Sequence, residues 1–374
     1  MVLRDININE NIKAGKVLII YGARRVGKTY LLHSYLGKCG LKYKLDSGDD
    51  IRIQDLLSNN RIDRITEYAE GYELIALDEA QRINNLGFGL KILIDARPDL
   101  NVIVTGSSLF EINQQVGEPL TGRKRELMMF PFSQNELLNV YNKYELKEKL
   151  NGFLVFGSYP EIALAKNKQE KTELLVEIVN SYLFKDVLSV ENIRGNKQII
   201  DLLKLLAFQI GSQVSVNELA TQVRMDVKTI QRYLDILERA FVVKRLTPYS
   251  KNLRKEITSK NKYYFIDNGI RNGLIMQFND LSYRNDVGQL FENFIFSERL
   301  KHNEYKRVFT TSYFWRTFDK KEIDLVEELN GQLNAYEIKY GSNKKYKVPN
   351  DFINNYLDST FKVVDRENYL EFVL

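Results

Sequence analysis

Glycine, lysine and threonine fall near the N-terminus at a spacing that suits phosphate binding. Gly22 is followed by four residues and then by Gly27, Lys28 and Thr29. Glycines let the backbone turn so that its N–H groups face phosphate oxygens at a helix N-terminus. The lysine then reaches the β- and γ-phosphates, and the threonine hydroxyl ligates Mg²⁺. The predicted nucleotide-binding residues are Gly22, Ala23, Arg24, Arg25, Val26, Gly27, Lys28, Thr29 and Tyr30.

Two acidic residues end the next strongly apolar stretch. ELIALDEAQRI, residues 73–83, is an apolar run followed by Asp78 and Glu79. Side chains alternate in direction along a strand, so neighbouring acids can take separate roles. Asp78 is predicted to hold Mg²⁺, and Glu79 to act as general base toward the attacking water. Pairs of acids also end strands without catalysis, but the position of this pair after the glycine-rich loop favours an ATPase.

A third apolar strand, NVIVTGSS at residues 101–108, ends in hydroxyl groups. In ATPases with an extra strand between the phosphate-loop strand and the acidic strand, a polar residue at this end senses the γ-phosphate. Ser107 is the first choice for this role and Thr105 the second. Both residue types also end strands simply as turn formers.

An arginine downstream of this strand is a candidate arginine finger. Arg123 lies in LTGRKRELMMFPFSQNE. Its charge would meet the γ-phosphate either in trans, which requires an oligomer, or after loop closure. The alternative interpretation is a plain surface arginine.

Acids and a lysine near the C-terminus suit metal-dependent cleavage of a phosphodiester bond. Glu292 is expected on a helix, Asp324 on one strand, and Glu337 and Lys339 on the next. The turn ELNGQL predicts a hairpin that brings Asp324 near Glu337. The three acids would bind Mg²⁺, and the lysine would orient the water. The alternative is a domain of the same shape that has lost this activity.

A basic segment separates these two groups of residues. Residues 201–262 carry 12 basic and 6 acidic side chains. Within them, NELATQV and KTIQRYLDILERA predict two short helices, and the strand FVVKRLTPY follows, which is typical of a winged helix-turn-helix. The residues predicted to contact DNA from the second helix are Lys228, Thr229, Gln231 and Arg232. Winged helices also serve as protein-interaction modules, which is the alternative.

Composition limits the remaining chemistry. The 374 residues are 44% hydrophobic and 28% charged, with a net charge of +5, which is typical of a folded multidomain protein. A single cysteine, Cys39, excludes an internal disulfide, and two histidines make a histidine-based centre unfavourable. No apolar run is long enough to cross a membrane and the N-terminus is too polar for a signal peptide, so we expect a cytoplasmic protein without membrane contact.

In order along nearly the whole chain, the sequence resembles prokaryotic AAA-family ATPases fused to a C-terminal domain of unknown function 4143. SYLFKDV departs from the family pattern, which leaves the roles of Lys185 and Asp186 open. The matching stretches are YGARRVGKTYLL, LIALDEAQ, VTGSS, TGR followed by FPFS, FGSYPE, SYLFKDV, NELATQVRMDVKTIQRYLDILERAFVV, KYYFIDNGIRNGL, GQLFENFIFSERL, FWRT and EIDLVEELNGQLNAYEIK.

The resemblance implies an α/β fold with an AAA-type P-loop domain, a winged helix and a terminal fold similar to restriction endonucleases. The predicted domains are a P-loop ATPase domain at 1–145, a helical lid at 146–200, a winged helix-turn-helix at 201–265 and a nuclease-like PD-(D/E)xK domain at 266–374. We expect an ATPase that uses Mg²⁺ and couples nucleotide state to DNA binding, with or without nuclease action. The alternative is an ATP-dependent switch for protein partners with an inactive terminal domain.

Overall fold

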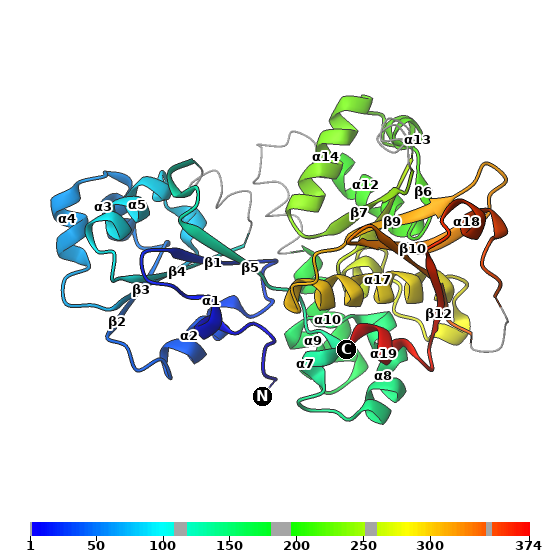
Figure 1. Ribbon diagram of the computed structural model, residues 1–374, viewed down its shortest axis with the longest axis horizontal. Coiled ribbons are helices and arrows are strands. Elements are labelled where there is room, and N and C mark those ends of the chain that lie inside the picture. Colours follow the sequence, from blue (N-terminus) through cyan, green and yellow to red (C-terminus); the bar gives the residue numbers. More distant parts are fainter. Residues whose placement is uncertain (1, 108–117, 181–195, 251–259, 342–345) are drawn as a thin grey trace. The chain divides into compact units, whose positions relative to one another are not determined.

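The computed structural model describes residues 2–107, 118–180, 196–250, 260–341 and 346–374 (Figure 1). The chain divides into two compact units. The N-terminal unit comprises residues 4–130 together with 239–241, and the C-terminal unit comprises residues 1–3, 131–238 and 242–374. Lys185 and Asp186, whose roles the sequence left open, lie outside the described residues.

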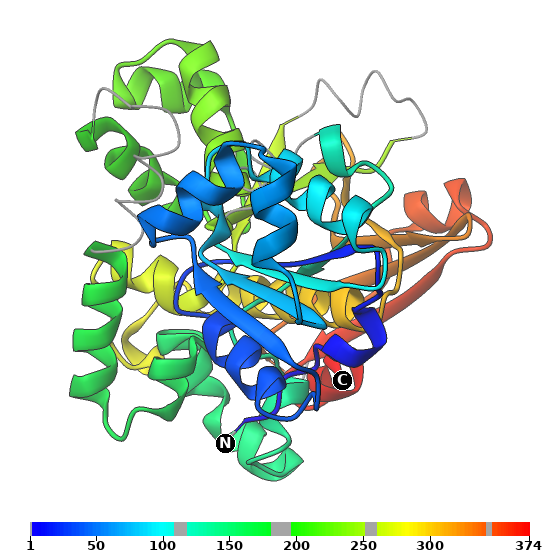
Figure 2. The same cartoon turned by 90° about the vertical axis from the view of Figure 1, so that its left-hand side faces the viewer.

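The N-terminal unit is a parallel sheet with helices on both faces (Figures 1 and 2). Its strands are β1 (Val17–Tyr21), β2 (Tyr43–Ser47), β3 (Leu74–Asp78), β4 (Asn101–Gly106) and β5 (Lys124–Met128). Its helices are α1 (Ile8–Asn11), α2 (Lys28–Leu36), α3 (Ile51–Ser58), α4 (Ile62–Tyr68) and α5 (Leu86–Ala96), with short 3₁₀ turns η1 (Ala80–Arg82) and η2 (Glu118–Leu120).

The strand order of this sheet is β2-β3-β4-β1-β5, and every neighbouring pair is parallel. Strand β4 therefore lies between β1 and β3, as the sequence predicted. Because side chains alternate along a strand, one set of residues faces α3, α4 and α5, and includes the fully buried Ile75 and Leu77. Parallel strands end at the same edge of a sheet, so the ends of β1, β3 and β4 gather their polar residues there.

The C-terminal unit contains a seven-stranded mixed sheet in the order β12-β11-β10-β9-β7-β8-β6. The strands are β6 (Gln213–Val214), β7 (Val243–Pro248), β8 (Asn261–Phe265), β9 (Thr311–Arg316), β10 (Glu322–Leu329), β11 (Gln332–Lys339) and β12 (Thr360–Asp365). Its helices are α7 (Gln134–Leu137), α8 (Lys143–Phe156), α9 (Pro160–Leu164), α10 (Lys168–Ile178), α12 (Asn196–Phe208), α13 (Val216–Val223), α14 (Val227–Arg239), α16 (Asn268–Leu274), α17 (Val287–Tyr305), α18 (Asn350–Asn355) and α19 (Tyr369–Val373), with a 3₁₀ turn η4 (Leu281–Tyr283).

Two hydrophobic clusters cover the two faces of this sheet. Phe291, Phe294 and Ile295 of α17 pack with residues of β8 to β12 and of α8. Phe352 of α18 packs with Trp315 and other residues to form the second cluster. Strands β10 and β11 pair as the antiparallel hairpin that the sequence predicted around Asn330 and Gly331.

The segment that follows the N-terminal unit packs within the C-terminal unit. Lys301 of α17 is 1% exposed and donates to the Phe132 carbonyl at 2.9 Å and to Ser158 Oγ at 3.1 Å. Glu298 of the same helix accepts from the backbone of Gln134 at 2.7 Å. These buried polar contacts would lose their partners if the segment moved away. Residues 131–180 therefore group with the C-terminal unit, and the ATPase lid at residues 146–200 stays a prediction.

Helices α12, α13 and α14 precede the antiparallel strands β7 and β8, and β6 lies between α12 and α13 along the chain. Ser215 caps α13, because its side chain accepts a hydrogen bond from Glu218 N. Arg224 ends that helix in the left-handed conformation, with φ at 58°. No helix in the described part of the chain is long and apolar enough to cross a membrane.

Candidate functional site

The glycine-rich loop joins the end of β1 to the start of α2, as predicted. Lys28 is 5% exposed, and its ammonium donates to the carbonyl oxygens of Gly22 and Ala23 at 2.8 Å each. A Cβ at Gly22 would lie 2.1 Å from the Met129 carbonyl oxygen, so only glycine fits this turn. Gly27 begins the helix with φ at 98°, a conformation that also favours glycine. The loop thus holds its lysine at the N-terminus of α2, where phosphate groups bind.

The other predicted nucleotide-binding residues differ in exposure. Ala23 and Val26 are buried in the core, so only their backbone groups can meet a phosphate. Arg24 is half-buried, Arg25 has φ at 58°, and the Tyr30 side chain is exposed.

The two predicted magnesium ligands from different elements lie side by side. Thr29 Oγ1 at the start of α2 donates to Asp78 Oδ2 at the end of β3, at 2.8 Å. Thr105 of β4 donates to the other oxygen, Asp78 Oδ1. A hydroxyl and a carboxylate are the hard oxygen ligands that Mg²⁺ prefers, so these residues fit that ion. The pairing arises because strands β1, β3 and β4 are parallel and end at one edge of the sheet.

Glu79 is tied to the predicted sensor residue through a glutamine. Gln81 Nε2 donates to Glu79 Oε2 at 2.7 Å and to Ser107 Oγ at 3.0 Å. Gln81 Oε1 is buried and accepts no hydrogen bond from the described residues. Sequence reasoning missed Gln81, although its place two residues after Glu79 in DEAQ was a usable signal. The predicted general base and the predicted sensor are therefore parts of one polar network.

Arg123 does not lie beside the phosphate loop of its own chain. Its carbonyl oxygen accepts from Val17 N at 2.9 Å, so it sits where β1 begins, whereas the loop follows the end of β1 at Tyr21. The strand between them has five residues and spans about 17 Å. The Arg123 guanidinium instead pairs with Asp95 of α5. A role within one chain conflicts with this placement, and a role in trans stays a prediction.

The predicted recognition helix presents three polar side chains to solvent. Lys228, Gln231 and Arg232 are exposed on the first turns of α14. Thr229 is half-buried instead, and both its backbone N–H and its hydroxyl donate to Asp226, at 2.9 and 2.5 Å. Asp226 therefore caps the helix by accepting both hydrogen bonds from Thr229.

The predicted terminal-domain residues also meet. Asp324 is 7% exposed on β10, and its Oδ2 accepts from Ile338 N at 2.8 Å and from Lys339 Nζ at 3.1 Å. Lys339 Nζ lies 2.8 Å from Glu337 Oε1. The hairpin thus joins Asp324 and Glu337 through one lysine, as its register predicts.

Glu292 joins the same group from α17, together with residues that the sequence analysis did not single out. Its Oε1 accepts from Lys262 Nζ at 3.2 Å and from the Tyr264 hydroxyl at 2.5 Å. Lys262 Nζ also lies 2.5 Å from Glu322 Oε1. Lys262 and Tyr264 stand in the quoted stretch KYYFIDNGIRNGL, and Glu322 precedes Asp324 by two positions, but nothing in this spacing predicts that these residues meet. We call Lys262, Tyr264, Glu292, Glu322, Asp324, Glu337 and Lys339 the acidic cluster.

Burial and like charge shape the pKa values in the acidic cluster. Burial, opposed by Lys262, raises the pKa of Glu292 to about 7, with the charge of Asp324 adding to the shift. Burial and Asp324 likewise raise the pKa of Glu337. Burial disfavours the charge of Lys262, but the carboxylates of Glu292 and Glu322 outweigh it and raise the pKa of this ammonium. Lys262 therefore stays charged at neutral pH.

Among the described residues, no group of three or more histidine, cysteine, aspartate or glutamate side chains is arranged to hold a metal ion. The predicted metal ligands Glu292, Asp324 and Glu337 are among the described residues and do not form such a group. Each of the three already accepts a hydrogen bond or ion pair from a lysine.

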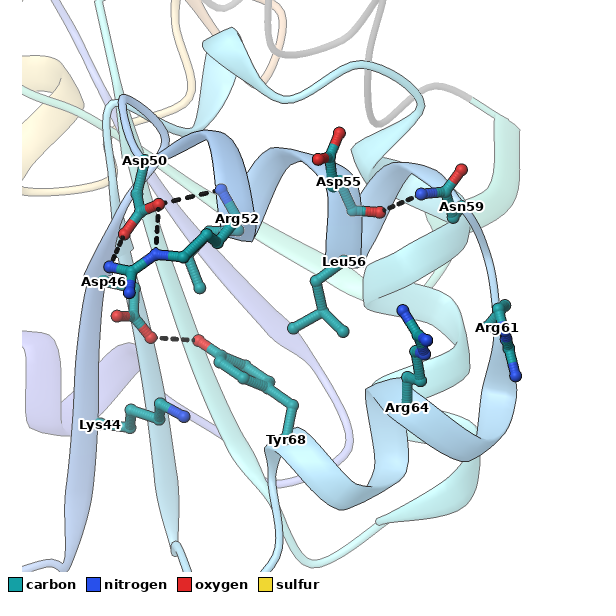
Figure 3. Close-up of a pocket in the computed structure, with 11 residues that line it drawn as sticks. Lys44, Asp46, Asp50, Arg52, Asp55, Leu56, Asn59, Arg61, Arg64 and Tyr68 are labelled. Atoms are coloured by element: carbon teal, nitrogen blue, oxygen red, sulfur yellow. Dashed lines mark hydrogen bonds and ion pairs between the residues drawn. The ribbon is translucent and has the colours of Figure 1, made fainter.

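A hollow of about 400 Å³ opens beside β2, α3 and α4 of the N-terminal unit (Figure 3). Tyr68 donates to Asp46 Oδ2 at 2.6 Å, and the ammonium of Lys44 lies 4.1 Å from the Tyr68 ring centre. Arg52 pairs with Asp50 at 2.6 Å. Cationic side chains alternate with carboxylates around this hollow, and no predicted nucleotide-binding residue lines it. The nucleotide site predicted at the glycine-rich loop is therefore distinct from this hollow.

Comparison with protein families places three domains along the chain. An AAA domain matches residues 14–138, a domain of unknown function (DUF8612) matches residues 147–281, and a domain of unknown function (DUF4143) matches residues 287–370. The first match covers the whole nucleotide site, and the third covers the acidic cluster except Lys262 and Tyr264.

Similar chains occur in archaea and bacteria. An uncharacterized protein of Methanocaldococcus jannaschii is 26% identical over 100% of this chain and 90% of its own length. An uncharacterized protein of Haemophilus influenzae is 24% identical over 83% of this chain and 79% of its own. One of Mycobacterium tuberculosis is 26% identical over 86% of this chain and 70% of its own.

Among solved structures, the Walker-type ATPase of Pyrococcus abyssi is similar over 69% of this chain and 91% of its own, with 16% identity and a TM-score of 0.45. Drosophila ORC bound to AT-rich DNA and Cdc6 is similar over 71% of this chain and 87% of its own, with 12% identity and a TM-score of 0.25. The chain combines an AAA domain with a C-terminal domain of unknown function (DUF4143), as its sequence motifs predicted.

Proposed function

We propose that this protein binds ATP with Mg²⁺ at the glycine-rich loop, hydrolyses it, and couples the nucleotide state to DNA binding. The observation that carries the ATPase proposal is the contact between Thr29 Oγ1 and Asp78 Oδ2 at 2.8 Å. Residues 49 positions apart in the chain bring together the hydroxyl and the carboxylate that hold Mg²⁺ in P-loop ATPases.

The surrounding residues have distinct roles in this proposal. Lys28 would exchange its two carbonyl partners for the β- and γ-phosphates, because an ammonium binds charged oxygens more strongly than neutral ones. Glu79 would accept the proton of the attacking water, and Gln81 would hold its carboxylate in place. Bound Mg²⁺ would neutralise charge on the phosphates. Ser107 would report the γ-phosphate to Glu79 through Gln81.

The DNA-binding part of the proposal concerns residues 201–265. The order α12, β6, α13, α14, β7 and β8, with the three strands pairing antiparallel, is the element order of a winged helix. Lys228, Gln231 and Arg232 are exposed at the start of the second helix of the pair, where recognition helices contact bases and phosphates.

For the terminal domain we favour the interaction-module alternative over Mg²⁺-dependent cleavage. A nuclease of this type needs carboxylate oxygens open to a metal ion. Glu292, Asp324 and Glu337 instead face the ammonium groups of Lys262 and Lys339. A domain that keeps a nuclease-like shape without the activity is consistent with this arrangement.

The ATPase proposal is tested by phosphate release from the purified full chain with Mg²⁺. Lys28→Ala removes the phosphate-binding cation, and Glu79→Gln removes the base while keeping the size of the side chain. Each is expected to lower kcat by about 100-fold or more, because general-base and electrostatic contributions have this size. Glu79→Gln should retain ATP affinity, since it leaves the loop intact.

The matched control is Lys38→Ala, which removes an exposed lysine just after α2 and should leave hydrolysis unchanged. Hydrolysis at the wild-type rate in both site variants would show that the ATPase site lies elsewhere.

A further inference from the structure

Lys262 is a buried cation at the centre of the acidic cluster. It is 1% exposed on β8, and its Nζ lies 3.2 Å from Glu292 Oε1 and 2.5 Å from Glu322 Oε1. Its Nζ lies over the Phe314 ring, 5.4 Å from the ring centre. A buried ammonium is stable only when carboxylates compensate its charge, so this position is specified by the surrounding acids.

Each carboxylate that could bind a metal already pairs through at least one oxygen with a donor of the protein itself. Asp324 Oδ2 accepts from a backbone N–H and from Lys339, and Glu337 Oε1 pairs with Lys339. Glu322 Oε2 pairs with Arg316 at 2.8 Å. A divalent ion among these oxygens would have to displace an ammonium and would be repelled by the remaining cations.

We propose that Lys262 is a built-in cation that takes the place of a divalent metal ion in the acidic cluster. The cluster therefore binds no divalent metal while Lys262 is in place, and removing this one ammonium converts it into a metal site. A tethered cation loses no translational freedom when it enters the cluster, which gives it an advantage over a free ion.

Lys262 lies outside the sequence motif of the terminal domain that supplies Asp324 and Glu337. Lys262 lies on β8, which pairs with β6 and β7, whereas Asp324 and Glu337 lie on the β10–β11 hairpin. The turn before β6 also closes on the cluster, because a Cβ at Gly211 would lie 3.1 Å from Glu292 Oε2. The inference does not rest on ATP hydrolysis, so a failed ATPase proposal would leave it intact.

The test measures binding of Mn²⁺ to the nucleotide-free full chain by electron paramagnetic resonance, which counts free and bound ions. The variants are Lys262→Met, which keeps the length of the side chain, Asp324→Asn, and the double variant. Mn²⁺ bound at the acidic cluster should be lost when Asp324 is replaced, whereas Mn²⁺ bound elsewhere should be retained. Lys244→Met is the matched control, since it removes a lysine of the same unit that pairs with Glu238 and is 45% exposed.

We expect Lys262→Met to bind one more Mn²⁺ per chain than either wild type or the double variant. Mn²⁺ should raise the melting temperature of Lys262→Met and leave that of wild type and Lys244→Met unchanged. Wild type and Asp324→Asn should bind Mn²⁺ equally.

Two results would overturn the proposal. The first is Asp324-dependent binding of Mn²⁺ to wild type, which would mean that Lys262 does not exclude the metal. The second is a folded Lys262→Met that gains no Mn²⁺. If Lys262→Met does not fold without metal, the comparison of wild type with Asp324→Asn decides the matter alone.

Discussion

Glu79 adopts a left-handed backbone conformation, with φ at 51° and ψ at 39°. A side chain such as glutamate adopts this conformation at a cost of about 1–3 kcal/mol, and such costs concentrate at functional sites. Thr105 Oγ1 accepts from Glu79 N at 3.3 Å, and Gly48 packs so closely that a Cβ there would lie 2.3 Å from the Glu79 carbonyl oxygen. At the residue scale, the proposed base is held from three sides, by Thr105, Gly48 and Gln81.

The variant Gln81→Ala is predicted to lower kcat by about 10-fold to 100-fold while KM for ATP changes little. Gln81 fixes the direction of the Glu79 carboxylate, and a misplaced catalytic group costs rate in this range, whereas Gln81 is not expected to contact the phosphates. Steady-state hydrolysis at varied ATP concentration separates the two constants.

Gln169→Ala is the control, since this exposed glutamine bonds to Glu173 on α10. If Gln81→Ala raised KM with kcat intact, Gln81 would act in binding and not in positioning.

At the element scale, several residues of the motif KYYFIDNGIRNGL join helices to strand β8. Asp267 caps α16 and accepts from Ser158 N at 2.7 Å. Asn268 donates to the carbonyl oxygens of Leu154 and Leu290 at 3.2 and 2.9 Å. The motif FGSYPE thus meets a motif more than 100 residues away. Buried polar residues of these motifs satisfy backbone groups, and their role is to position α8, α16 and α17.

Asp286→Asn is predicted to destabilise the C-terminal unit by about 3–5 kcal/mol. Arg271 reaches Asp286 at 2.6 Å and Arg284 reaches it at 2.8 Å, and both arginines are nearly buried, at 2% and 4% exposure of their side chains. The variant leaves two buried guanidinium groups without their carboxylate. Urea unfolding followed by circular dichroism measures the loss.

The ion pairs of Asp286 with Arg271 and Arg284 also make the stability of the C-terminal unit depend on pH. Burial disfavours the Asp286 carboxylate, but hydrogen bonds from Arg284 and the charge of Arg271 outweigh it and lower the pKa of this group. Its stabilisation is therefore present above the unfolded pKa, near 3.9, and is lost as pH falls through the lower folded value. The difference between wild type and Asp286→Asn should shrink over that range.

Asp280→Asn is the control for Asp286, because its ion pair with Lys168 is exposed. Such a pair contributes about 0–1 kcal/mol. Equal losses in the two variants would contradict the role given to burial.

At the scale of the whole molecule, the two candidate sites belong to different units. The glycine-rich loop, Asp78 and Gln81 lie in the N-terminal unit, and the acidic cluster and α14 lie in the C-terminal unit. Coupling between nucleotide and DNA would then require the nucleotide state to change the free energy of DNA binding by the C-terminal unit.

Duplex DNA is predicted to bind the full chain with an affinity that falls steeply with salt, because released counterions drive phosphate contacts. The variant Lys228→Ala with Arg232→Ala should lower the slope of log affinity against log salt by about 2, since it removes two such contacts. Fluorescence anisotropy of labelled DNA at several KCl concentrations measures the slope. ATP hydrolysis should change when DNA is added.

Lys143→Ala, an exposed position on α8, should leave the salt slope unchanged. Absence of DNA binding even at low salt would favour the alternative in which the winged helix binds protein partners.

The sequence by itself determined the local features whose physics is local. The spacing of Gly22, Gly27 and Lys28 specifies a turn before a helix, and Asn330 with Gly331 specifies a hairpin, because both depend on backbone conformations that few residues adopt. The comparison of NVIVTGSS with the extra strand of some ATPases also predicted that strand β4 lies between β1 and β3. Thr29 and Asp78 were both predicted to hold Mg²⁺, and they lie close together because parallel strands end at a common edge of the sheet.

Only the tertiary structure decided which distant residues compensate one another. Nothing in the spacing of Lys262, Glu292 and Glu322 indicates that one lysine lies between these two acids, because sheet order brings β8 and α17 together. The tertiary structure likewise placed Arg123 at the edge of the sheet away from the phosphate loop. It also grouped residues 131–180 with α17. Ion pairs and buried hydrogen bonds act over a few ångströms, so they depend on positions in space that sequence separation does not contain.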